Sequence, residues 1–420
     1  MGDLTAMIVR ITRSKALGLV EAPRSKSWAI RLILLSTISN GESIICGLPQ
    51  SDDVEAAIRM AKVLGAEVKQ SGECIVVTPN SKPCGGYVDV GGSGTTLRIG
   101  TALAATCRGS ITIDGDETLR GRPIRELLES LEELGARVSG YSLPVTVTGP
   151  IKGGFVEVRG DLTSQYISGL MLTGLVVGLT IRVIGEPVSR QYIDLTRRVI
   201  EESGCSVHAT GDAITINQCT PRLGTINVPG DYALSGFYAA LALTTGGSVT
   251  VTGLPEPMGH GDDSVVNLFR EMGAVSTFSN GNWTIEGEGG LSGVSVNLRD
   301  SPDLAPVMAS VAPFAVGETV ITGVRHLAFK ESNRLVTMSS TLRAFGVHVQ
   351  YGEDEIRILG SRTHGTVIKC PSDHRIAMMS GVIGAGSEGE TTIDNAECVN
   401  KSNRLFWRDL SRLGINLQEG

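Results

Sequence analysis

A serine and two cations stand at the start of an expected helix, in the segment APRSKSWAIR at residues 22–31. Lys26 and Ser27 fall in its first turn, and Arg31 lies one turn after Ser27. Helix N-terminal amides, a hydroxyl and two positive charges would then converge on one anion, a phosphate or a carboxylate. An ordinary capped helix with solvated cations fits this segment equally well.

A glycine-rich turn is a second candidate anion site. In GGSGTTLR at residues 91–98, the missing side chain of Gly94 would let a ligand approach the backbone. We expect Thr95 and Thr96 to cap a helix that continues through residues 99–105. The turn lacks the GK[ST] ending of a P-loop, and taken alone it is better explained as a simple tight turn.

Two further segments place hydrogen-bonding groups at expected helix starts. Arg122 precedes Pro123, which we expect at the first helical position, and its guanidinium could hold a carboxylate or phosphate by two parallel hydrogen bonds. The next apolar helix opens with Thr163, Ser164 and Gln165. Solvated charge explains Arg122, and simple capping explains the other three, when each segment stands alone.

The second half of the chain carries cations and carboxylates in three segments. Lys330 and Arg334 are spaced to share one helical face with Glu331 between them, although a surface salt bridge uses the same spacing. Asp303 precedes an apolar helix, where partial desolvation could raise its pKa and make it a base. Arg375 falls in the first turn of another apolar helix, where the helix dipole disfavours a cation unless an anion binds.

Length, charge and cysteine usage exclude several classes. The 420 residues predict two domains of about 200 residues each, and the net charge of −7 argues against a nucleic-acid partner. The eight cysteines are scattered without C-x-x-C spacing, which predicts reduced thiols and no metal site. Since we find no signal peptide and no apolar stretch of membrane length, we expect a cytoplasmic protein without membrane association.

One phrase recurs along the chain: the end of an apolar helix, then glycine, then a β-prone segment. Its glycines recur every 68 to 73 residues, at Gly65, Gly135, Gly204, Gly273, Gly346 and Gly414. Glycine suits the left-handed residue that ends a helix, and a strand is expected to follow it. The period predicts six units of βαβαββ type in two domains of three, although a solenoid of six stacked repeats has the same periodicity.

The domain boundary is expected near residues 228–230, between the third and fourth units. The first strand region, residues 8–19, is too short to be a unit, and we expect it to pair with the C-terminal domain. The predicted first domain therefore covers residues 22–228, and the second combines residues 1–21 with residues 229–420.

Read in order, these segments resemble the enolpyruvyl transferase family, and within it the members that act on shikimate 3-phosphate. The segments are APRSKSWAIR, GGSGTTLR, RGRPI, TSQYISGL, SRQYID, SPDLAPV, KESNRL and SDHRIAM, and the resemblance extends over residues 22–410. It implies an α/β fold, a two-domain inside-out α/β barrel with three βαβαββ units in each domain. It also implies an active site in the cleft between the domains.

The resemblance implies which residues contact each substrate. Those expected to bind shikimate 3-phosphate are Lys26, Ser27, Arg31, Thr163, Ser164, Gln165, Ser189, Tyr192, Asp303 and Lys330. Those expected to bind phosphoenolpyruvate are Lys26, Gly94, Thr95, Arg122, Gln165, Arg334, Arg375 and Lys401. The two substrates bring about five negative charges, which these cations would balance, and binding is expected to draw the domains together.

The implied reaction belongs to the shikimate pathway and requires no metal or organic cofactor. The 5-hydroxyl of shikimate 3-phosphate adds to C2 of phosphoenolpyruvate while C3 is protonated, and the tetrahedral intermediate then loses phosphate and a C3 proton. We expect Asp303 to act as the base, and Glu331, with Lys26 or Lys330, as the acid at C3. His326 is close enough to Lys330 in sequence to line the site. We expect a monomer.

Three positions depart from the family pattern. Gly92 stands where asparagine is usual, Thr163 where serine is usual, and KSNRLFW at residues 401–407 where a Lys-Ser-aromatic-Pro run is usual. The last change removes a turn fixed by proline beside Lys401.

Three other functions share this fold. The branch that acts on UDP-N-acetylglucosamine carries a reactive cysteine before its RP segment, and residues 111–122 contain none. A non-catalytic protein that binds phosphate ligands is a second alternative, against which Asp303, Lys330 and Glu331 argue. The net charge of −7 disfavours a relative that acts on RNA ends.

Overall fold

The computed structural model describes residues 7–259, 261–287 and 289–420, so the first six residues of the second expected domain lie outside the description. The chain forms two compact units. The continuous unit is Arg24–Val228, and the composite unit joins the segment that ends at Pro23 to Pro229–Gly420. No helix within the three described ranges is long and apolar enough to cross a membrane.

The continuous unit contains three sheets of four strands each. In spatial order the first is β14 (Thr225–Asn227), β3 (Ser43–Cys46), β5 (Cys74–Thr78) and β4 (Glu67–Ser71). The second is β6 (Gly86–Asp89), β7 (Ser110–Asp114), β9 (Val145–Thr148) and β8 (Arg137–Val138). The third is β10 (Gly154–Arg159), β11 (Leu179–Ile184), β13 (Ala213–Ile216) and β12 (His208–Thr210). In each sheet the first pair is parallel and the other two pairs are antiparallel.

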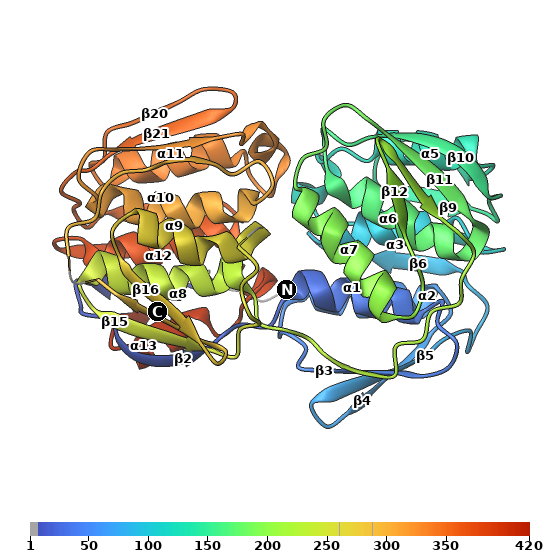
Figure 1. Cartoon of the computed structure of the whole chain (residues 1–420), viewed down its shortest axis with the longest axis horizontal. Helices are drawn as coiled ribbons and strands as arrows, with labels where there is room; N and C mark the ends of the chain where they lie inside the picture. The colour runs from blue at the N-terminus through green and yellow to red at the C-terminus, as the bar shows by residue number, and fades with distance from the viewer. Residues whose placement is uncertain (1–6, 260, 288) are drawn as a thin grey trace. The chain divides into compact units, whose positions relative to one another are not determined.

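Helices accompany these sheets (Figure 1). They are of two kinds, which differ in the burial of their side chains. The helices with mostly buried residues are α1 (Lys26–Ser36), α3 (Gly94–Ala104) and α6 (Ser164–Val177). The helices with one exposed, charged face are α2 (Asp52–Val63), α5 (Arg125–Glu133) and α7 (Arg190–Glu202), and α4 (Glu117–Arg120) is a single turn. Because α1, α3 and α6 are apolar on most sides, they form the centre of the unit's core.

The composite unit repeats this plan. Its first sheet, in spatial order, is β16 (Val275–Ser279), β17 (Asn282–Glu286), β15 (Ser248–Thr252) and β2 (Leu17–Glu21). The second is β18 (Ser295–Asn297), β19 (Glu318–Thr322), β21 (Glu355–Leu359) and β20 (Val349–Tyr351). The third is β22 (Val367–Lys369), β23 (Glu390–Asp394), β1 (Val9–Thr12) and β24 (Asn416–Glu419). Its buried helices are α8 (Tyr232–Thr245), α10 (Ala305–Val311) and α12 (His374–Gly386). The others are α9 (Val265–Glu271), α11 (Arg334–Ala344) and α13 (Phe406–Arg412), with short 3₁₀ turns η1 (Gly261–Ser264), η2 (Pro302–Leu304), η3 (Ala312–Phe314), η4 (Arg325–Phe329) and η5 (Ala396–Lys401).

The repeated glycines end six helices as expected. Each has a positive φ, between 85° and 103°, and stands two positions after the last residue of α2, α5, α7, α9, α11 or α13, and a strand follows each one. Glycine adopts this backbone conformation without a steric penalty. The predicted α/β fold of repeated units is therefore confirmed.

The N-terminal segment completes two sheets of the composite unit. Strand β1 lies between β23 and β24, so that Val9 pairs with both Ile393 and Glu419. Strand β2 pairs in parallel with β15. Each of these sheets then has the same one parallel and two antiparallel pairs as the others.

Three expected helix starts are wrong. Ser93, rather than Thr95 or Thr96, precedes α3, and its hydroxyl donates a hydrogen bond to the Thr96 hydroxyl at 2.9 Å. Pro123 is not the first residue of α5, which begins at Arg125 after Ile124, because Arg98 holds the Pro123 carbonyl at 2.7 Å outside the helix. Lys330 does not lie on α11 with Arg334.

Asn333 explains the last difference. Its side chain accepts a hydrogen bond from the backbone N–H of Val336 and so caps α11, which begins at Arg334. Lys330 follows η4 in an extended conformation. The Lys330 and Arg334 side chains therefore have the sequence spacing of one helical face without sharing a helix.

The prediction of reduced thiols is wrong for six cysteines. Disulfides join Cys46 to Cys74, Cys84 to Cys107 and Cys205 to Cys219, all within the continuous unit. The pairing depends on strand register, since Cys46 and Cys74 are opposite residues of β3 and β5. Disulfides persist mainly in oxidising compartments, and intracellular proteins of hyperthermophiles are an exception.

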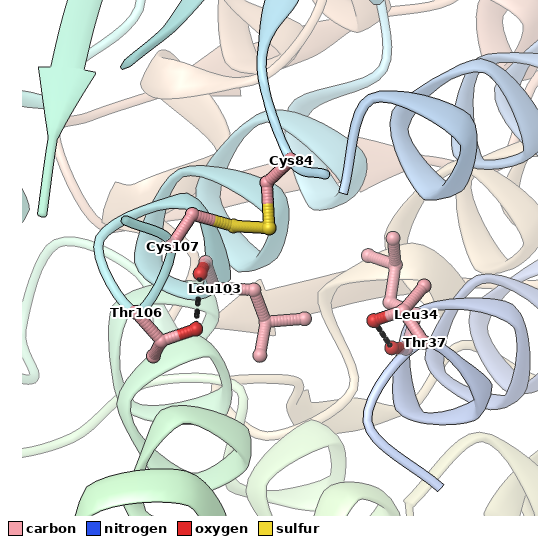
Figure 2. Close-up of a disulfide and its surroundings, with 6 residues drawn as sticks. All are labelled: Leu34, Thr37, Cys84, Leu103, Thr106 and Cys107. Carbon is pink, nitrogen blue, oxygen red and sulfur yellow. Dashed lines mark hydrogen bonds between the residues drawn. A yellow bond between two sulfur atoms is a disulfide. The ribbon is translucent and has the colours of Figure 1, made fainter. Parts of the chain in front are cut away.

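One disulfide lies close to the ends of two core helices (Figure 2). Beside Cys84–Cys107, the Thr106 hydroxyl donates to the Leu103 carbonyl at 2.8 Å at the end of α3. The Thr37 hydroxyl donates to the Leu34 carbonyl at 2.7 Å at the end of α1. Each of these carbonyls also accepts a backbone N–H, from Thr106 at 2.9 Å and from Thr37 at 3.2 Å, so the hydroxyls add a second hydrogen bond at each helix end.

The disulfides should stabilise the continuous unit. Replacing both Cys46 and Cys74 by serine opens a loop of 28 residues in the unfolded chain, and we expect a loss of about 3–4 kcal/mol in unfolding free energy. Denaturant unfolding of this variant and of the wild type, both without reductant, measures the difference. Replacing both Cys370 and Cys398, which are free thiols in the structure, is the control, and an equal loss in the two variants would contradict the prediction.

Candidate active site

The first residue of α1 forms an ion pair. Lys26 Nζ lies 2.9 Å from Asp53 Oδ2, and both side chains are largely buried. Asp53 belongs to the first turn of α2, whose start Ser51 caps by accepting from the Val54 N–H. The structure thus holds Lys26 at the N-terminus of α1 by a carboxylate from the neighbouring helix.

Arg31 is buried among neutral oxygens. Its side chain is 1% exposed and donates to the Thr196 hydroxyl at 2.8 Å, the Ser27 carbonyl at 2.9 Å, and the Ser168 hydroxyl and Tyr192 carbonyl at 3.2 Å. Burial lowers the pKa of Arg31 to about 10, so it stays protonated at neutral pH. A buried cation whose described partners are uncharged favours an anion nearby.

The N-termini of α3 and α6 are linked directly. Gln165 donates to the Thr95 hydroxyl at 3.0 Å and accepts from Arg98 at 2.6 Å. Arg98 also holds the Pro123 carbonyl, next to Arg122. Arg98 therefore positions three of the expected binding segments at once.

Gly94 is the first residue of α3, and two guanidinium groups lie close to the point where a side chain would begin. A Cβ added there would lie 2.9 Å from Arg98 Nη1 and 3.1 Å from Arg122 Nη1. Arg122 itself reaches the Gly92 carbonyl at 3.4 Å. Both guanidinium groups thus pack against the backbone at the start of this helix.

Three more expected residues lie at helix starts. The Thr163 side chain accepts from the Gln165 N–H at 3.3 Å, so Thr163 caps α6 as predicted, and Ser164 is the first residue of that helix. Ser189 precedes α7 in the left-handed region, with φ 56°, which a serine rarely adopts. The Tyr192 ring packs under Arg31, with its centroid 5.8 Å from the guanidinium carbon.

In the composite unit, three carboxylates surround Arg334. The side chain is 1% exposed and contacts Asp373 at 2.9 Å, Asp303 at 3.1 Å and Glu331 at 2.7 Å. Burial alone would lower the pKa of Arg334, but these carboxylates outweigh it and raise the pKa. Arg334 is therefore a fixed positive charge at the centre of the cluster.

Asp303 connects two arginines. Its Oδ2 accepts from Arg375 at 2.8 Å and its Oδ1 from Arg334 at 3.1 Å. Arg375 also donates to the Asp303 carbonyl at 3.2 Å. Two guanidinium partners stabilise an ionised carboxylate, so ion pairing, and not desolvation alone, determines the environment of Asp303.

The remaining expected residues of this unit lie around Glu331. Its Oε1 is 4.0 Å from Lys401 Nζ, and Lys401 is the last residue of η5. Lys330 precedes Glu331 in the chain, and its side chain is partly buried. His326, in η4, is 4% exposed, and desolvation followed by the positive charge of Lys330 lowers its pKa to about 3.

Within the continuous unit, contacts join Gln165 to Thr95 and Tyr192 to Arg31. Within the composite unit, ion pairs link five expected residues: Asp303, Glu331, Arg334, Arg375 and Lys401. The sequence analysis did not identify three residues that hold expected site residues: Asp53, Arg98 and Asp373. Arg98 belongs to the segment GGSGTTLR and Asp373 to the segment SDHRIAM, but only their partners across the fold reveal their positioning roles. In the described ranges no group of three or more His, Cys, Asp or Glu side chains could hold a metal ion.

Comparison with solved structures defines the class of fold. A structure described as EPSP synthase from Acinetobacter baumannii superposes with a TM-score of 0.84 at 24% identity and covers 99% of this chain and 100% of its own. The enolpyruvyl transferase NikO from Streptomyces tendae gives a TM-score of 0.78 at 15% identity, with 99% of each chain covered. The chain has the enolpyruvyl transferase fold.

Sequence comparison defines the family. A family model described as EPSP synthase (3-phosphoshikimate 1-carboxyvinyltransferase) matches residues 11–410. A relative of that name from Caldivirga maquilingensis is 69% identical, with 98% of this chain and 99% of its own length covered. Another from Sulfurisphaera tokodaii is 41% identical over 97% of this chain and 98% of its own length. The chain belongs to the EPSP synthase family and is an enolpyruvyl transferase, which confirms the family resemblance seen in the sequence.

Asp373 should be essential for the stability of the composite unit. It holds Arg334, accepts from the Ser332 hydroxyl at 2.9 Å and caps α12 by accepting from the Arg375 N–H at 3.1 Å. Asp373→Ala leaves a buried cation with fewer partners, and we expect a loss of about 3–5 kcal/mol in urea unfolding.

A matched control removes an exposed carboxylate. Asp212 pairs with Arg182 at 3.0 Å, and more than half of each side chain is exposed. Asp212→Ala should leave the unfolding midpoint unchanged. A similar midpoint for the two variants would show that Asp373 contributes no more than a surface ion pair.

The buried His326 should make stability depend on pH. Its pKa falls from 6.5 to about 3 on folding. Between these two pH values the imidazole is protonated in the unfolded chain and neutral in the folded chain. Stability contributed by the neutral ring is complete above pH 6.5 and is lost as the pH falls toward about 3. Urea unfolding measured from pH 7 to pH 4 should show a shallower decline in unfolding free energy for His326→Gln than for the wild type. Parallel curves for the two proteins would show that His326 does not cause the pH dependence.

Proposed function

We propose that this chain transfers the enolpyruvyl group of phosphoenolpyruvate to the 5-hydroxyl of shikimate 3-phosphate and releases phosphate. The step belongs to chorismate and aromatic amino-acid biosynthesis. Family membership supports the reaction, and one structural observation supports the site most strongly. This observation is the direct link between the N-termini of α3 and α6, through Gln165 and Thr95 at 3.0 Å, in the same unit as the buried cation Arg31.

The continuous unit offers the groups that a phosphorylated alcohol needs. Arg31 is a buried positive charge with neutral partners, and Lys26 and Ser27 stand in the first turn of the same helix. Ser164 and Gln165 present the N-terminus of α6, where backbone N–H groups favour an anion. We assign shikimate 3-phosphate to these residues, together with Thr163, Ser189 and Tyr192, and to Asp303 and Lys330 of the composite unit.

Phosphoenolpyruvate carries a phosphate and a carboxylate, and forked cations suit both groups. We assign it to Arg334, Arg375 and Lys401, together with Lys26, Gly94, Thr95, Arg122 and Gln165. Asp303, Glu331 and Asp373 hold the first two cations in fixed positions. Such preorganisation reduces the reorganisation that substrate binding would otherwise require.

Proton transfers follow from the positions of two carboxylates. Asp303 is held by two arginines, so it is available as an ionised acceptor for the proton of the attacking hydroxyl or later of the C3 methyl group. Glu331, between Arg334 and Lys401, must take up a proton before it can protonate C3, and Lys26 or Lys330 is the alternative donor. The intermediate then expels phosphate.

The residues assigned to the two substrates come from both units. We also propose that the chain works as a monomer in the cytoplasm. The biosynthetic role of the family supports this location, while size-exclusion chromatography with light scattering tests the monomer.

Phosphate release is the direct test of the proposed function. Purified protein is incubated with phosphoenolpyruvate and either shikimate 3-phosphate or UDP-N-acetylglucosamine. Release only with shikimate 3-phosphate is expected. Release only with the nucleotide sugar would assign the chain to the sister activity, and release with neither would support a non-catalytic binding protein.

Asp303 should contribute to chemistry more than to binding. Asp303→Asn keeps the size of the side chain but removes the negative charge and the proton acceptor, and we expect kcat to fall by roughly 10²–10⁴-fold. The KM for phosphoenolpyruvate should change by less than about tenfold. Equal losses in kcat and in phosphoenolpyruvate affinity, measured by steady-state kinetics and calorimetry, would assign Asp303 to binding alone.

A further inference from the structure

Two cysteines of the composite unit lie beside each other without a disulfide between them. Cys370 follows β22, and Cys398 is part of η5. Their Sγ atoms are 3.9 Å apart, and each of the other six cysteines is already paired within the continuous unit. A disulfide needs the two sulfurs at roughly 2 Å, so side-chain rotation and a small shift would bring them to bonding distance.

The backbone around the two cysteines is held by one turn. The Cys370 N–H donates to the Asp394 carboxylate at 2.7 Å, and the Cys370 carbonyl accepts from the Asn395 side chain at 3.2 Å. The Cys398 N–H donates to the Asn395 carbonyl at 3.2 Å. Both segments are therefore fixed to Asp394 and Asn395, which keeps the sulfurs within reach of each other.

We propose that Cys370 and Cys398 form a fourth, reversible disulfide in response to a low-molecular-weight disulfide oxidant. The more exposed Cys398 attacks one sulfur of the oxidant as a thiolate and releases one thiol. The sulfur of Cys370 then attacks the mixed disulfide at Cys398 and releases the second thiol. The protein loses two electrons and two protons, and the oxidant takes them up as two thiols.

The order of attack follows from burial. Cys370 is 7% exposed, whereas Cys398 is partly exposed. The hydrogen bond with Cys398, followed by burial, raises the pKa of the Cys370 thiol. Cys370 is therefore a poor first nucleophile, and it reacts only after the mixed disulfide at Cys398 has placed an electrophilic sulfur beside it.

The bond would join two segments of the proposed phosphoenolpyruvate site within one unit. Cys370 lies three residues before Asp373, which holds Arg334, and Cys398 lies three residues before Lys401. The cross-link would hold η5 to the segment that leads into α12. Its formation itself does not depend on the proposed reaction.

The test maps the thiols of the full-length chain. Wild-type protein is incubated with oxidised glutathione or left untreated, denatured, alkylated with N-ethylmaleimide and digested for mass spectrometry. We expect a Cys370–Cys398 cross-linked peptide only after oxidation, and its loss after brief treatment with reduced glutathione. We also expect the midpoint of thermal unfolding to rise by roughly 5–15 °C on oxidation.

Cys398→Ser is the matched control, in which Cys370 should stay alkylated and the thermal midpoint should not rise. In the wild type, alkylation of both cysteines after oxidation, or one stable glutathione on either cysteine, would overturn the proposal. A cross-link between two chains, seen as a dimer on a non-reducing gel, would overturn it as well. Neither readout involves turnover, so a negative result here is distinct from a failure of the proposed reaction.

Discussion

Burial of three apolar helices in the middle of each unit is the constraint on which the rest of the structure depends. A buried helix satisfies its own backbone groups except at its ends, where the first N–H groups need other partners. In the continuous unit the helices begin at Lys26, Gly94 and Ser164, and each start carries cations, hydroxyls or bare backbone. The fold therefore places cations and hydroxyls at helix N-termini, whose N–H groups lack intrahelical partners, and an anionic substrate can accept hydrogen bonds from such groups.

Two buried arginines show different ways of meeting the cost of a buried charge. Three carboxylates neutralise Arg334, which makes it a rigid part of the composite unit. Arg31 has oxygen partners that are neutral, so its charge is oriented but not compensated. The first arrangement fixes neighbouring side chains, and the second leaves electrostatic attraction for a ligand.

The sequence predicted the parts of the molecule that local rules determine. A glycine after each of six helices follows from backbone sterics, and the caps at Thr163 and the position of Arg375 follow from helix-end chemistry. Residues that act through distant partners were missed. Asp53 accepts a hydrogen bond from Lys26, which lies 27 positions earlier in the chain. Arg98 donates to Gln165, which lies 67 positions later.

Dependence on distant partners also explains two wrong predictions, the reduced cysteines and the shared helix of Lys330 and Arg334. Cysteine pairing across β3 and β5 depends on register, which spacing does not reveal. The spacing of Lys330 and Arg334 fitted one helix, but the cap at Asn333 separated them. In both cases a three-dimensional partner decided between structures that the local sequence left equally acceptable.

The position of β1 has a consequence for the order of events during synthesis. The continuous unit emerges from the ribosome as one uninterrupted stretch, whereas β1 needs β24, and Thr12 and Asn416 are 404 positions apart. At typical elongation rates β1 waits roughly 20–80 s for that partner. Nascent chains should therefore contain a folded continuous unit and a β1 segment that is not yet paired. The alternating apolar residues of β1 could bind a chaperone or a second chain until β24 is synthesised.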